Sequence, residues 1–519
     1  MPENFADIVI SGAGPNGLML ACELALAGLR PIVLDALPEP SPEPKANGLV
    51  GQVARVLDLR GLYDTFSGVP GPPTPVNRYI FGAMPLDLTA VQPNPVNLIM
   101  RPQPQMVRLL TDHAIGLGVD LRWGHALTEI DSGDGEVTVS VSGPDEDYRL
   151  RTRFLVGADG GKSLVRKRIG IDFPGVTATG HVSRVGHVTV PDGYRTGDGG
   201  IDIPGVGRFG LGHHRLERGM FVYAEIQPGN PMVGAVEFDG GDAFGDDTPL
   251  TIDELRASVE RVLGVPLALT APTGPGPHAL RRTVGQHTRV AERYREGNIL
   301  LLGDAAHVHS AMGGPGLNLG LQDTVNLGWK LAAEIHGWAP PGLLDTYESE
   351  RHPAAERVVM YSLSQSALIA PGPDVTELRK LFGELLDLPV VTAHIANLLA
   401  GSDIRYDTGD SHPLSGYLAP EVSIETASGA TRIAELLNEA RPVLLVFEAT
   451  ADPTAAATGW TDRITVVEAT AATPPAAALL IRPDGYIAWA TDDFTSESQG
   501  SLHTALHRWF GEPALVPTR

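Results

Sequence analysis

The sequence predicts an α/β and α+β protein, in which a parallel-sheet domain carries an inserted antiparallel sheet and precedes a smaller C-terminal α/β domain. Three observations predict this arrangement. A strand-helix-strand pattern opens the chain, and α/β patterns recur near 154–160 and 298–333. Between Gly180 and Glu237 apolar and polar residues alternate around frequent glycines, which is typical of an antiparallel sheet. After Gly401 the composition changes, and short apolar runs separated by turns indicate another unit.

The opening elements form a βαβ unit. Ala6 to Ser11 is a β-rich run that ends at glycines. Apolar residues then recur at helical spacing from Pro15 to Ala27, and Pro31 to Asp35 has the composition of a second strand. Further along, 343–369 predicts a long helix, and helical spacing continues to about Ala400. The chain therefore begins as a parallel α/β sheet and later provides helices to cover it.

The segment after Gly401 has strands and a closing helix of its own. Strands are expected at 442–448, 464–468, 479–481 and 487–490. The last two flank Asp484-Gly485, a pair that favours a hairpin turn, and 502–510 predicts the final helix. We therefore expect a separate C-terminal α/β domain.

With 519 residues, the chain is long enough for two or three domains that each bury a core. The predicted parallel-sheet domain, with its connecting helices, comprises 1–75, 100–178 and 280–400, the inserted sheet domain comprises 76–99 and 179–279, and the C-terminal domain comprises 401–519. The inserted sheet is the expected wall of a substrate site.

Charge and cysteine content exclude several classes of function. A formal net charge of -23 argues against nucleic-acid binding, which needs a basic face. No apolar run has the length of a membrane span and the N-terminus enters a strand directly, so we expect a cytoplasmic protein without a membrane partner. The chain has a single cysteine, Cys22, in the first predicted helix. One cysteine excludes disulfides and cysteine-rich metal sites within one chain. No metal site is predicted.

The first motif is a Gly-x-Gly-x-x-Gly loop between the first strand and the first helix. Its glycines allow a tight turn, close approach of a pyrophosphate to the backbone, and close helix packing, and the helix N-terminus faces the phosphates. The acid that ends the next strand can accept hydrogen bonds from a ribose. This context predicts a Rossmann-like dinucleotide site. The expected contacts are Gly12, Gly14, Pro15, Asn16, Gly17 and Asp35.

Two more motifs follow strands. Gly157-Ala158-Asp159-Gly160 places Asp159 at the C-terminal end of a predicted strand, where open parallel sheets bind ligands. Farther on, Gly303-Asp304 is followed by a glycine-rich loop and a helix start. Asp304 can bind a ribityl or ribose hydroxyl, and the backbone N–H groups of the helix start can stabilise the negative charge of a reduced flavin. The expected contacts in this third motif are Gly303, Asp304, Pro315, Gly316, Leu317 and Asn318.

Together the three motifs resemble those of the class A flavoprotein aromatic hydroxylases, the family that includes para-hydroxybenzoate hydroxylase and phenol hydroxylase. They occur in the family order as GAGPNG, GADGGKSLVR and GDAAH with GGPGLNLGLQD, and the resemblance covers residues 1 to about 400. The appended C-terminal domain is similar to that of polyketide-tailoring and rifampicin-type monooxygenases. The resemblance implies that this domain is thioredoxin-like, although here it has no cysteine and is therefore redox-inert.

The resemblance also implies an activity. FAD would be reduced by transiently bound NADPH or NADH and would react with O₂ to a C4a-hydroperoxide, which hydroxylates an aromatic, polycyclic and polyketide-like molecule. By the same resemblance Asp159 lies near the pyrophosphate and the nicotinamide path, and Gln103 in Arg101-Pro102-Gln103 lies near the flavin phosphates. Lys45 stands where many relatives have an arginine beside the flavin, and Gln52 stands where another arginine is common.

The substrate side is less determined by sequence. Arg208, His213 and Tyr223 could anchor or deprotonate a phenol, although histidines in a glycine-rich loop are more often surface residues, and strand aromatics more often belong to a core. A flavin halogenase is disfavoured because no Trp-x-Trp-x-Ile-Pro signature occurs. Baeyer–Villiger or drug-inactivating oxygenation stays open, as does a non-catalytic FAD-fold binding protein. The sequence leaves the choice between a monomer and a homodimer open.

Overall fold

A computed structural model describes residues 5–514 except 44, 134, 227, 239–248, 274–275, 277, 311 and 313. Its first sheet is an eight-stranded sheet whose parallel centre has the order β19-β10-β1-β2-β7. The strands are β1 (Phe5–Ser11), β2 (Ile32–Asp35), β7 (Asp120–Trp123), β8 (Ala126–Gly133), β9 (Glu136–Ser142), β10 (Asp147–Gly157), β18 (Arg295–Glu296) and β19 (Ile299–Leu301).

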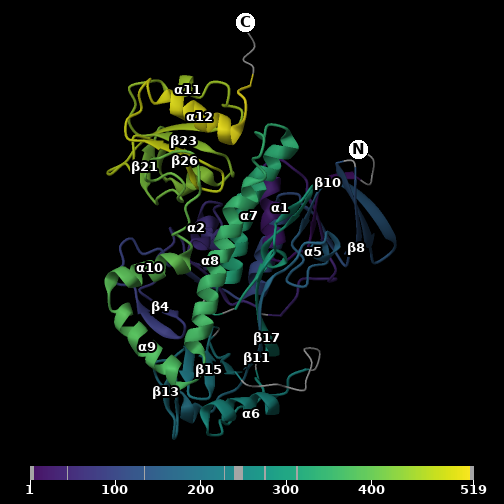
Figure 1. The fold of residues 1–519 in the computed structure, drawn as a ribbon, viewed down its shortest axis with the longest axis vertical. Coiled ribbons are helices and arrows are strands. Elements are labelled where there is room, and N and C mark those ends of the chain that lie inside the picture. Colours follow the sequence, from purple (N-terminus) through teal and green to yellow (C-terminus); the bar gives the residue numbers. More distant parts are fainter. Residues whose placement is uncertain are drawn as a thin grey trace.

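The helices of this part form the layer that covers the first sheet. α1 (Pro15–Leu26) packs between α4 (Gln103–Gly116) and α7 (Pro315–His336), and α8 (Thr346–Ile369) packs on α7. In Figure 1, α7 and α8 run through the middle of the molecule, with the C-terminal unit beside one end and the second sheet beside the other. These two helices therefore connect all parts of the fold. The βαβ opening predicted from the sequence is confirmed by β1, α1 and β2.

The second sheet is antiparallel, as the alternating sequence predicts. Its order is β14-β15-β16-β11-β17-β20. The strands are β11 (Gly175–His187), β14 (Gly212–Leu216), β15 (Gly219–Ala224), β16 (Met232–Glu237), β17 (Leu280–Val290) and β20 (His307–Val308), and α6 (Ile252–Leu263) covers one face. The sheet extends beyond the predicted range 179–279, because β17 pairs along most of β11. Through β20 it reaches the third glycine-rich motif.

Smaller elements connect these layers. Three two-stranded ribbons are β3 (Gly48–Val50) with β6 (Leu98–Met100), β4 (Arg78–Phe81) with β5 (Met84–Asp87), and β12 (Ile201–Ile203) with β13 (Gly207–Phe209). The remaining helices before the C-terminal unit are α2 (Val53–Asp58), α3 (Tyr63–Ser67), α5 (Leu164–Arg168), α9 (Pro373–Leu386) and α10 (Pro389–Ala400), with 3₁₀ turns at Asp192–Tyr194 and Gly303–Ala305. Among the described helices none is by itself long and apolar enough to cross a membrane; the pair α9 and α10, bent by 103°, meets that test only when taken together.

The C-terminal unit is a mixed six-stranded sheet of order β22-β21-β24-β23-β25-β26. Its elements are β21 (Ser423–Thr426), β22 (Gly429–Arg432), β23 (Val443–Val446), β24 (Thr465–Thr470), β25 (Ala478–Ile481), β26 (Ile487–Thr491), α11 (Pro453–Ala456), α12 (Gln499–Phe510) and a 3₁₀ turn at Ala434–Leu437. β23 is parallel to β24 and antiparallel to β25, and β25 forms the predicted hairpin with β26. The description of this unit as thioredoxin-like stays a prediction.

A buried ionic network joins the C-terminal unit to α7 and α8. Arg482, in the turn after β25, is fully buried and binds both carboxylate oxygens of Glu350 on α8, at 2.6 and 2.9 Å. Glu350 also accepts a hydrogen bond from Lys330 of α7 at 2.6 Å. Burial alone would raise the pKa of Glu350, but Arg482 and Lys330 lower it to about 2. The C-terminal unit is therefore held against the two helices by ionised groups that have little access to water.

Candidate functional site

The three predicted motifs meet at the C-terminal ends of adjacent parallel strands. Gly12 follows β1, Ala158 follows β10, and Gly303 follows β19, and these strands are neighbours in the sheet. The backbone continues the pairing past the strands, since Ala158 N donates to Ser11 O at 2.8 Å and Leu302 N donates to Gly157 O at 2.9 Å. Motifs that are up to about 290 residues apart in the sequence thus form one continuous edge, where ligands of open parallel sheets bind.

Close backbone contacts explain two of the glycines in the first motif. A Cβ on Gly12 would lie 2.3 Å from Ala158 O, and a Cβ on Gly17 would lie 1.9 Å from Gly12 O. Gly12 also has a φ of 110°, which L side chains rarely adopt. Gly14 differs, because a Cβ there would meet nothing within 4 Å. Gly12 and Gly17 are therefore required by the fold, whereas Gly14 leaves room beside the start of α1.

Asn16 joins the first motif to the third. Its side-chain Nδ2 would lie 2.0 Å from a Cβ on Gly303 and 2.3 Å from a Cβ on Gly320 of α7. The Asn16 Oδ1 atom is buried and has no hydrogen-bond partner in the described structure. Gly303 and Gly320 thus leave room for the Asn16 amide, and its oxygen has no donor among the described residues.

Asp159 and Arg166 hold the second motif in place. Asp159 Oδ2 accepts hydrogen bonds from Leu164 N at 2.7 Å and Val165 N at 3.1 Å, so this oxygen caps α5. Its Oδ1 atom is buried and unpartnered in the described structure. Arg166 of α5 donates to Ala305 O at 2.7 Å, which ties the second motif to the third. Asp159 therefore has a structural role that the sequence did not predict, and one oxygen remains for a ligand.

Asp35 and the start of α1 form the nucleotide end of this edge. Asp35 Oδ2 accepts a hydrogen bond from Ala13 N at 2.7 Å, and Oδ1 accepts one from Leu37 N at 2.9 Å. A carboxylate has lone pairs for further donors, such as ribose hydroxyls. α1 begins after Gly14 with Pro15 at its first position, with no side-chain cap and no acid in its first turn. Its free N–H groups and positive dipole end suit a phosphate.

Asp304 and Lys45 come together from distant parts of the chain. The Asp304 carboxyl is accessible to solvent, yet the surrounding protein raises its pKa by desolvation, and His307 and Lys45 oppose that effect. Lys45 is held near it because Arg101 N donates to Asn47 O at 3.1 Å and Gln103 N donates to Ala46 O at 2.8 Å. Arg101, Gln103 and Lys45 therefore lie in paired segments next to the third motif, whereas the Arg101 guanidinium itself binds Phe66 O.

The start of α7 has the geometry of an anion site. The helix begins after Gly314, whose φ is 66°, with Pro315 at the first position and no side-chain cap. His309 packs against this start, since a Cβ on Gly316 would lie 3.1 Å from its Cε1 atom. Desolvation, and then His307, lower the pKa of His309 to about 3, so the ring is neutral. The N–H groups near Gly316 and Leu317 are therefore the donors on this side.

A buried chain of polar groups supports the third motif at His307. His307 Nε2 lies 2.6 Å from Asp323 Oδ2, and Arg351 Nε donates to Asp323 Oδ1 at 2.7 Å. Arg351 also donates to the Tyr406 hydroxyl at 2.9 Å, in the segment that leads to the C-terminal unit. Asp323 and Arg351 are almost completely buried. The end of the third motif, at Asp323, is therefore joined to α8 by an ion pair that orients His307.

These features fit a dinucleotide that carries a flavin. Two helix starts without side-chain caps, the open space at Gly14, and the unpartnered Oδ atoms of Asn16 and Asp159 lie along one edge with Asp35 and Asp304. Donors at both helix starts match the negative charges of a pyrophosphate and of a reduced isoalloxazine. Carboxylates between them match hydroxyl groups of ribose and ribityl chains.

Comparisons with known proteins agree with this geometry. Residues 6–362 match the family described as FAD binding domain, and residues 412–513 match the family described as aromatic-ring hydroxylase, C-terminal. The chain belongs to the FAD-dependent aromatic-ring hydroxylases. The family predicted from the three motifs, and the use of FAD with a reduced nicotinamide, are thereby confirmed.

Individual relatives cover nearly the whole hydroxylase. It is 38% identical over 519 residues to 12-dehydrotetracycline 5-monooxygenase/anhydrotetracycline 6-monooxygenase of Streptomyces rimosus, across 98% of this chain and 99% of that protein. The solved structure of CabE, an aromatic hydroxylase from angucycline biosynthesis, is 36% identical with a TM-score of 0.85, across 98% of this chain and 99% of that one. Dialkyldecalin synthase of Streptomyces rugosporus is 34% identical, across 98% and 99%. One scaffold thus carries proteins named for different reactions.

The hydroxylase presents an apolar wall beside the loop that joins β20 to α7, which we call the flavin loop. Met220 and Val222 of β15, Val236 of β16 and Phe238 pack with Met312 of the third motif and Ile369 of α8, together with Ala83, and we call this group the Met312 cluster. Side chains alternate between the faces of a strand, so Phe221 and Tyr223 point the other way and pack under α6. The flavin-facing side of the second sheet is therefore the candidate substrate wall.

The three substrate-side candidates from the sequence fall in different places. His213 of β14 pairs with Val222 and shares its face, and desolvation followed by the nearby His214 lowers its pKa to about 4. Tyr223 is fully buried under α6, so its predicted contact with substrate is not supported. Arg208 is exposed and pairs with Asp198 at 2.6 Å, on the ribbon β12–β13, whose buried residues pack in the core with α6. Alternation along β15 could have separated Tyr223 from Val222, because neighbouring residues of a strand point to opposite faces.

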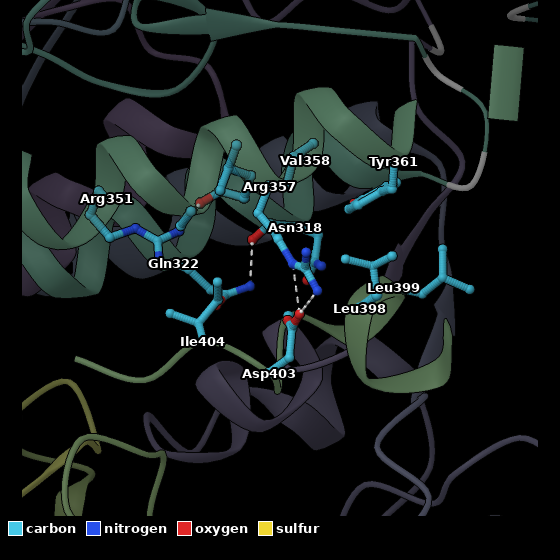
Figure 2. Close-up of a pocket in the computed structure, with 13 residues that line it drawn as sticks. Asn318, Gln322, Arg351, Arg357, Val358, Tyr361, Leu398, Leu399, Asp403 and Ile404 are labelled. Carbon is cyan, nitrogen blue, oxygen red and sulfur yellow. Dashed lines mark hydrogen bonds and ion pairs between the residues drawn. The ribbon is translucent and has the colours of Figure 1, made fainter. Parts of the chain in front are cut away.

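A cavity between α7, α8 and α10 is too small for a substrate. Figure 2 shows Asn318, Gln322, Arg357 and Asp403 converging on it. About 20 Å³ is available there to the centre of a water molecule, which is enough for one buried water. Asp403 Oδ1 is buried without a protein partner in the described structure, while Oδ2 binds Arg357 at 2.9 Å. This cavity, next to the Asp403 Oδ1 oxygen, has room for one water molecule but not for a substrate.

Residues on α8 that position the flavin loop were not predicted from sequence. Ser310 N donates to Ser362 Oγ at 3.2 Å, and Gln365 Nε2 donates to Met312 O at 3.4 Å. Gln365 Oε1 also accepts a hydrogen bond from Gly82 N at 3.1 Å. The sequence signal that could have found them is their spacing. Ser362 and Gln365 are three residues apart, and residues three or four apart share one face of a helix.

Proposed function

We propose that this hydroxylase adds one oxygen atom to a polycyclic, phenolic compound of the polyketide type. The observation that carries the proposal is the apolar Met312 cluster, which joins the second sheet to the loop before α7. A flat apolar wall suits a fused ring system, and few polar groups are needed to orient it. The relative that is 38% identical is named for tetracycline-type compounds.

The proposed cofactor contacts follow the edge described above. Asp35, the start of α1 and the atoms around Asn16 would hold the adenosine and pyrophosphate, and Asp304 with Lys45 would hold the ribityl chain. The N–H groups of Gly316, Leu317 and Asn318 would be the donors to the isoalloxazine. When bound, FAD would carry electrons from a reduced nicotinamide to O₂, and the transferred oxygen atom would come from O₂. The protein's part is to exclude water through the apolar wall and to aim the ring of the substrate.

The further assignments are part of the same proposal. The domain division at 1–75, 100–178 and 280–400, at 76–99 and 179–279, and at 401–519 is kept as a working division. NADPH or NADH binds transiently, and the relative rates at which the enzyme oxidises them decide between the two. A cytoplasmic location, and a monomer or homodimer, are also proposed; light scattering of the purified protein decides the oligomeric state.

The test uses purified protein with its bound FAD. We expect anhydrotetracycline or one of a panel of hydroxyanthraquinones to accelerate NADPH or NADH oxidation. Mass spectrometry should show a product heavier by one oxygen atom, and ¹⁸O₂ should label it. Hydrogen peroxide is measured in parallel, because oxidation of the nicotinamide without product yields peroxide.

Two outcomes would contradict the proposal. Nicotinamide oxidation that always ends in peroxide would exclude oxygen transfer to this class of compound. A product unchanged in mass but altered in its ring connectivity would exclude oxygen transfer. It would favour a reaction of the kind for which the relative dialkyldecalin synthase is named. Ring-expanded or ring-opened products, identified by NMR, would favour the Baeyer–Villiger alternative over hydroxylation.

A further inference from the structure

Three side chains from three elements form a hydrogen-bonded chain on the second sheet. His181 Nδ1 of β11 lies 3.0 Å from Gln286 Oε1 of β17. Gln286 Nε2 donates to Ser366 Oγ of α8 at 2.8 Å. Since α6 covers the other face of the sheet, this chain lies on the flavin-facing side with α8.

The donors and acceptors in this chain determine which nitrogen of His181 carries a proton. Ser366 Oγ donates its single proton to Ser362 O at 3.0 Å, so it can only accept from Gln286. The Gln286 NH₂ group therefore faces Ser366, and its carbonyl oxygen faces His181. A carbonyl oxygen only accepts, so Nδ1 must be the protonated nitrogen. In the neutral ring Nε2 then keeps a free lone pair.

The position of His181 is close to the flavin loop. Arg289 of β17 pairs with Val308 in the third motif, and Gln286 is three residues away along the same strand. At about 3.3 Å per residue this separation is roughly 10 Å. The His181 ring meets the Phe238 ring edge-on, with centroids 4.5 Å apart, and Phe238 packs on the Met312 cluster. His181 thus lies where the apolar wall approaches the flavin loop.

An irregularity in β11 orients this side chain. The register with β17 shifts between Ala178 and Val182, and Gly180 lies so close to Phe238 O that a Cβ there would be 2.5 Å away. Bulges of this kind change the direction of a side chain relative to its strand and often occur beside active sites. The partners of the His181 ring in the described structure, Gln286 and Phe238, are uncharged. Glu237, on the adjacent strand, faces the other side and pairs with Arg184 and Arg261.

We propose that His181 is a catalytic residue that accepts the proton of a phenolic substrate, and this inference rests on the proposed function. The phenolic O–H bond breaks and an Nε2–H bond forms. The electron pair stays on the phenolate oxygen and is delocalised into the ring. That delocalisation makes the ortho and para carbons more nucleophilic toward an electrophilic oxygen atom. Gln286 and Ser366 are positioning residues, because they act only through the His181 tautomer.

The first experiment measures ionisation of a bound probe without turnover. The probe is 2-hydroxyanthraquinone, a polycyclic phenol whose anion absorbs at longer wavelength than the neutral form. We expect wild-type enzyme with FAD to ionise the bound probe at a pH about one unit below that needed by His181→Asn, a roughly tenfold difference in proton affinity. Equal ionisation by both proteins would overturn the inference. His287→Asn is the matched control, since His287 is exposed on the same sheet and its Nδ1 lies 3.0 Å from Thr177 Oγ1.

The second experiment observes the tautomer directly. In ¹⁵N-histidine NMR of the resting enzyme, the signals missing from His181→Asn should show a protonated Nδ1 and an unprotonated Nε2. The opposite tautomer would overturn the inference. This measurement reports the tautomer of the wild-type enzyme, and the variant serves only to assign the signals. It therefore remains a test when the variant binds FAD poorly.

Turnover separates this inference from the proposed function. His181→Asn should hydroxylate the probe about 10²-fold more slowly with unchanged FAD content, and the loss should diminish at high pH, where the free phenol ionises. Gln286→Glu should hold the imidazole proton more tightly and move the rising limb of the rate to higher pH, whereas Gln286→Leu should slow the reaction without that shift. Wild-type enzyme that ionises the probe but never oxygenates it would count against the proposed function alone.

Discussion

At the scale of single residues, neighbouring glycines of one motif serve different purposes. Gly17 packs directly against the backbone of Gly12, whereas Gly14 has a φ of -71° and open space around its missing Cβ. Gly14→Ala should therefore fold normally and lose FAD affinity about tenfold or more, which is roughly 1.4 kcal/mol. Gly17→Ala should lower the thermal midpoint of the protein without FAD, because its Cβ would overlap Gly12 O. Thermal unfolding with and without FAD, combined with FAD titration, measures both; equal loss of stability in the two variants would contradict this distinction.

The two carboxylates of the site should also differ in their contributions to FAD binding. Asp304→Ala should give largely colourless protein, because Asp304 is the acid next to the flavin loop and is not committed to capping a helix. Asp35→Ala should weaken FAD binding less, by roughly 1–3 kcal/mol, since the remaining contacts to the nucleotide persist. Asp112→Ala, exposed on α4, is the control. Absorbance of bound flavin gives the occupancy, and stoichiometric FAD in Asp304→Ala would refute the assigned role.

At the scale of elements, the turn between β25 and β26 is a buried anchor on α7 and α8. Arg482 binds Glu350 and Asp484 and is fully buried. Arg482→Met should destabilise the protein by about 3–5 kcal/mol, because two carboxylates lose a buried partner. Arg441→Met is the control, since Arg441 is exposed and donates to a backbone carbonyl, Asp462 O, at 3.1 Å. Thermal unfolding measures the difference, and equal midpoints for the two variants would show that the network carries little stability.

At the scale of the whole molecule, the same network makes stability depend on acid. The pKa of Glu350 is lower in the folded protein than its ordinary value of 4.5. Its contribution is therefore complete above that ordinary value and is lost as the pH falls toward about 2. The advantage in thermal midpoint of wild type over Glu350→Gln should shrink from about pH 6 to about pH 3. Glu377→Gln, exposed on α9, should show no such trend. A difference that stays constant over this range would contradict the ionised state of Glu350.

Much of the parallel sheet and its motifs could be predicted because the signals are local. A strand, a glycine turn and a helix start are contiguous in sequence, so β1, α1 and β2 were expected within one residue of their observed ends. The hairpin at Asp484-Gly485 was predicted for the same reason. The added strands β21 and β22 were not, because they are four residues long and mostly polar.

The site was predictable only in part. The residues of the three motifs meet at one edge because parallel neighbouring strands end together, and this follows from the topology once the strands are known. The face to which Tyr223 points and the capping role of Asp159 depend on contacts with α6 and α5. Alternation along β15 separates Tyr223 from Val222, but neither segment reports which face α6 covers or that Asp159 caps α5.

By itself the sequence determined the chemistry that the chain can hold, because glycine loops and strand-ending aspartates act through local backbone geometry. The tertiary structure alone decided how distant groups combine. It set the tautomer of His181 through Gln286 and Ser366, and it placed Arg482 between two helices more than a hundred residues earlier in the chain. Such contacts arise from packing between elements that are far apart in sequence, and a linear pattern does not encode which faces meet.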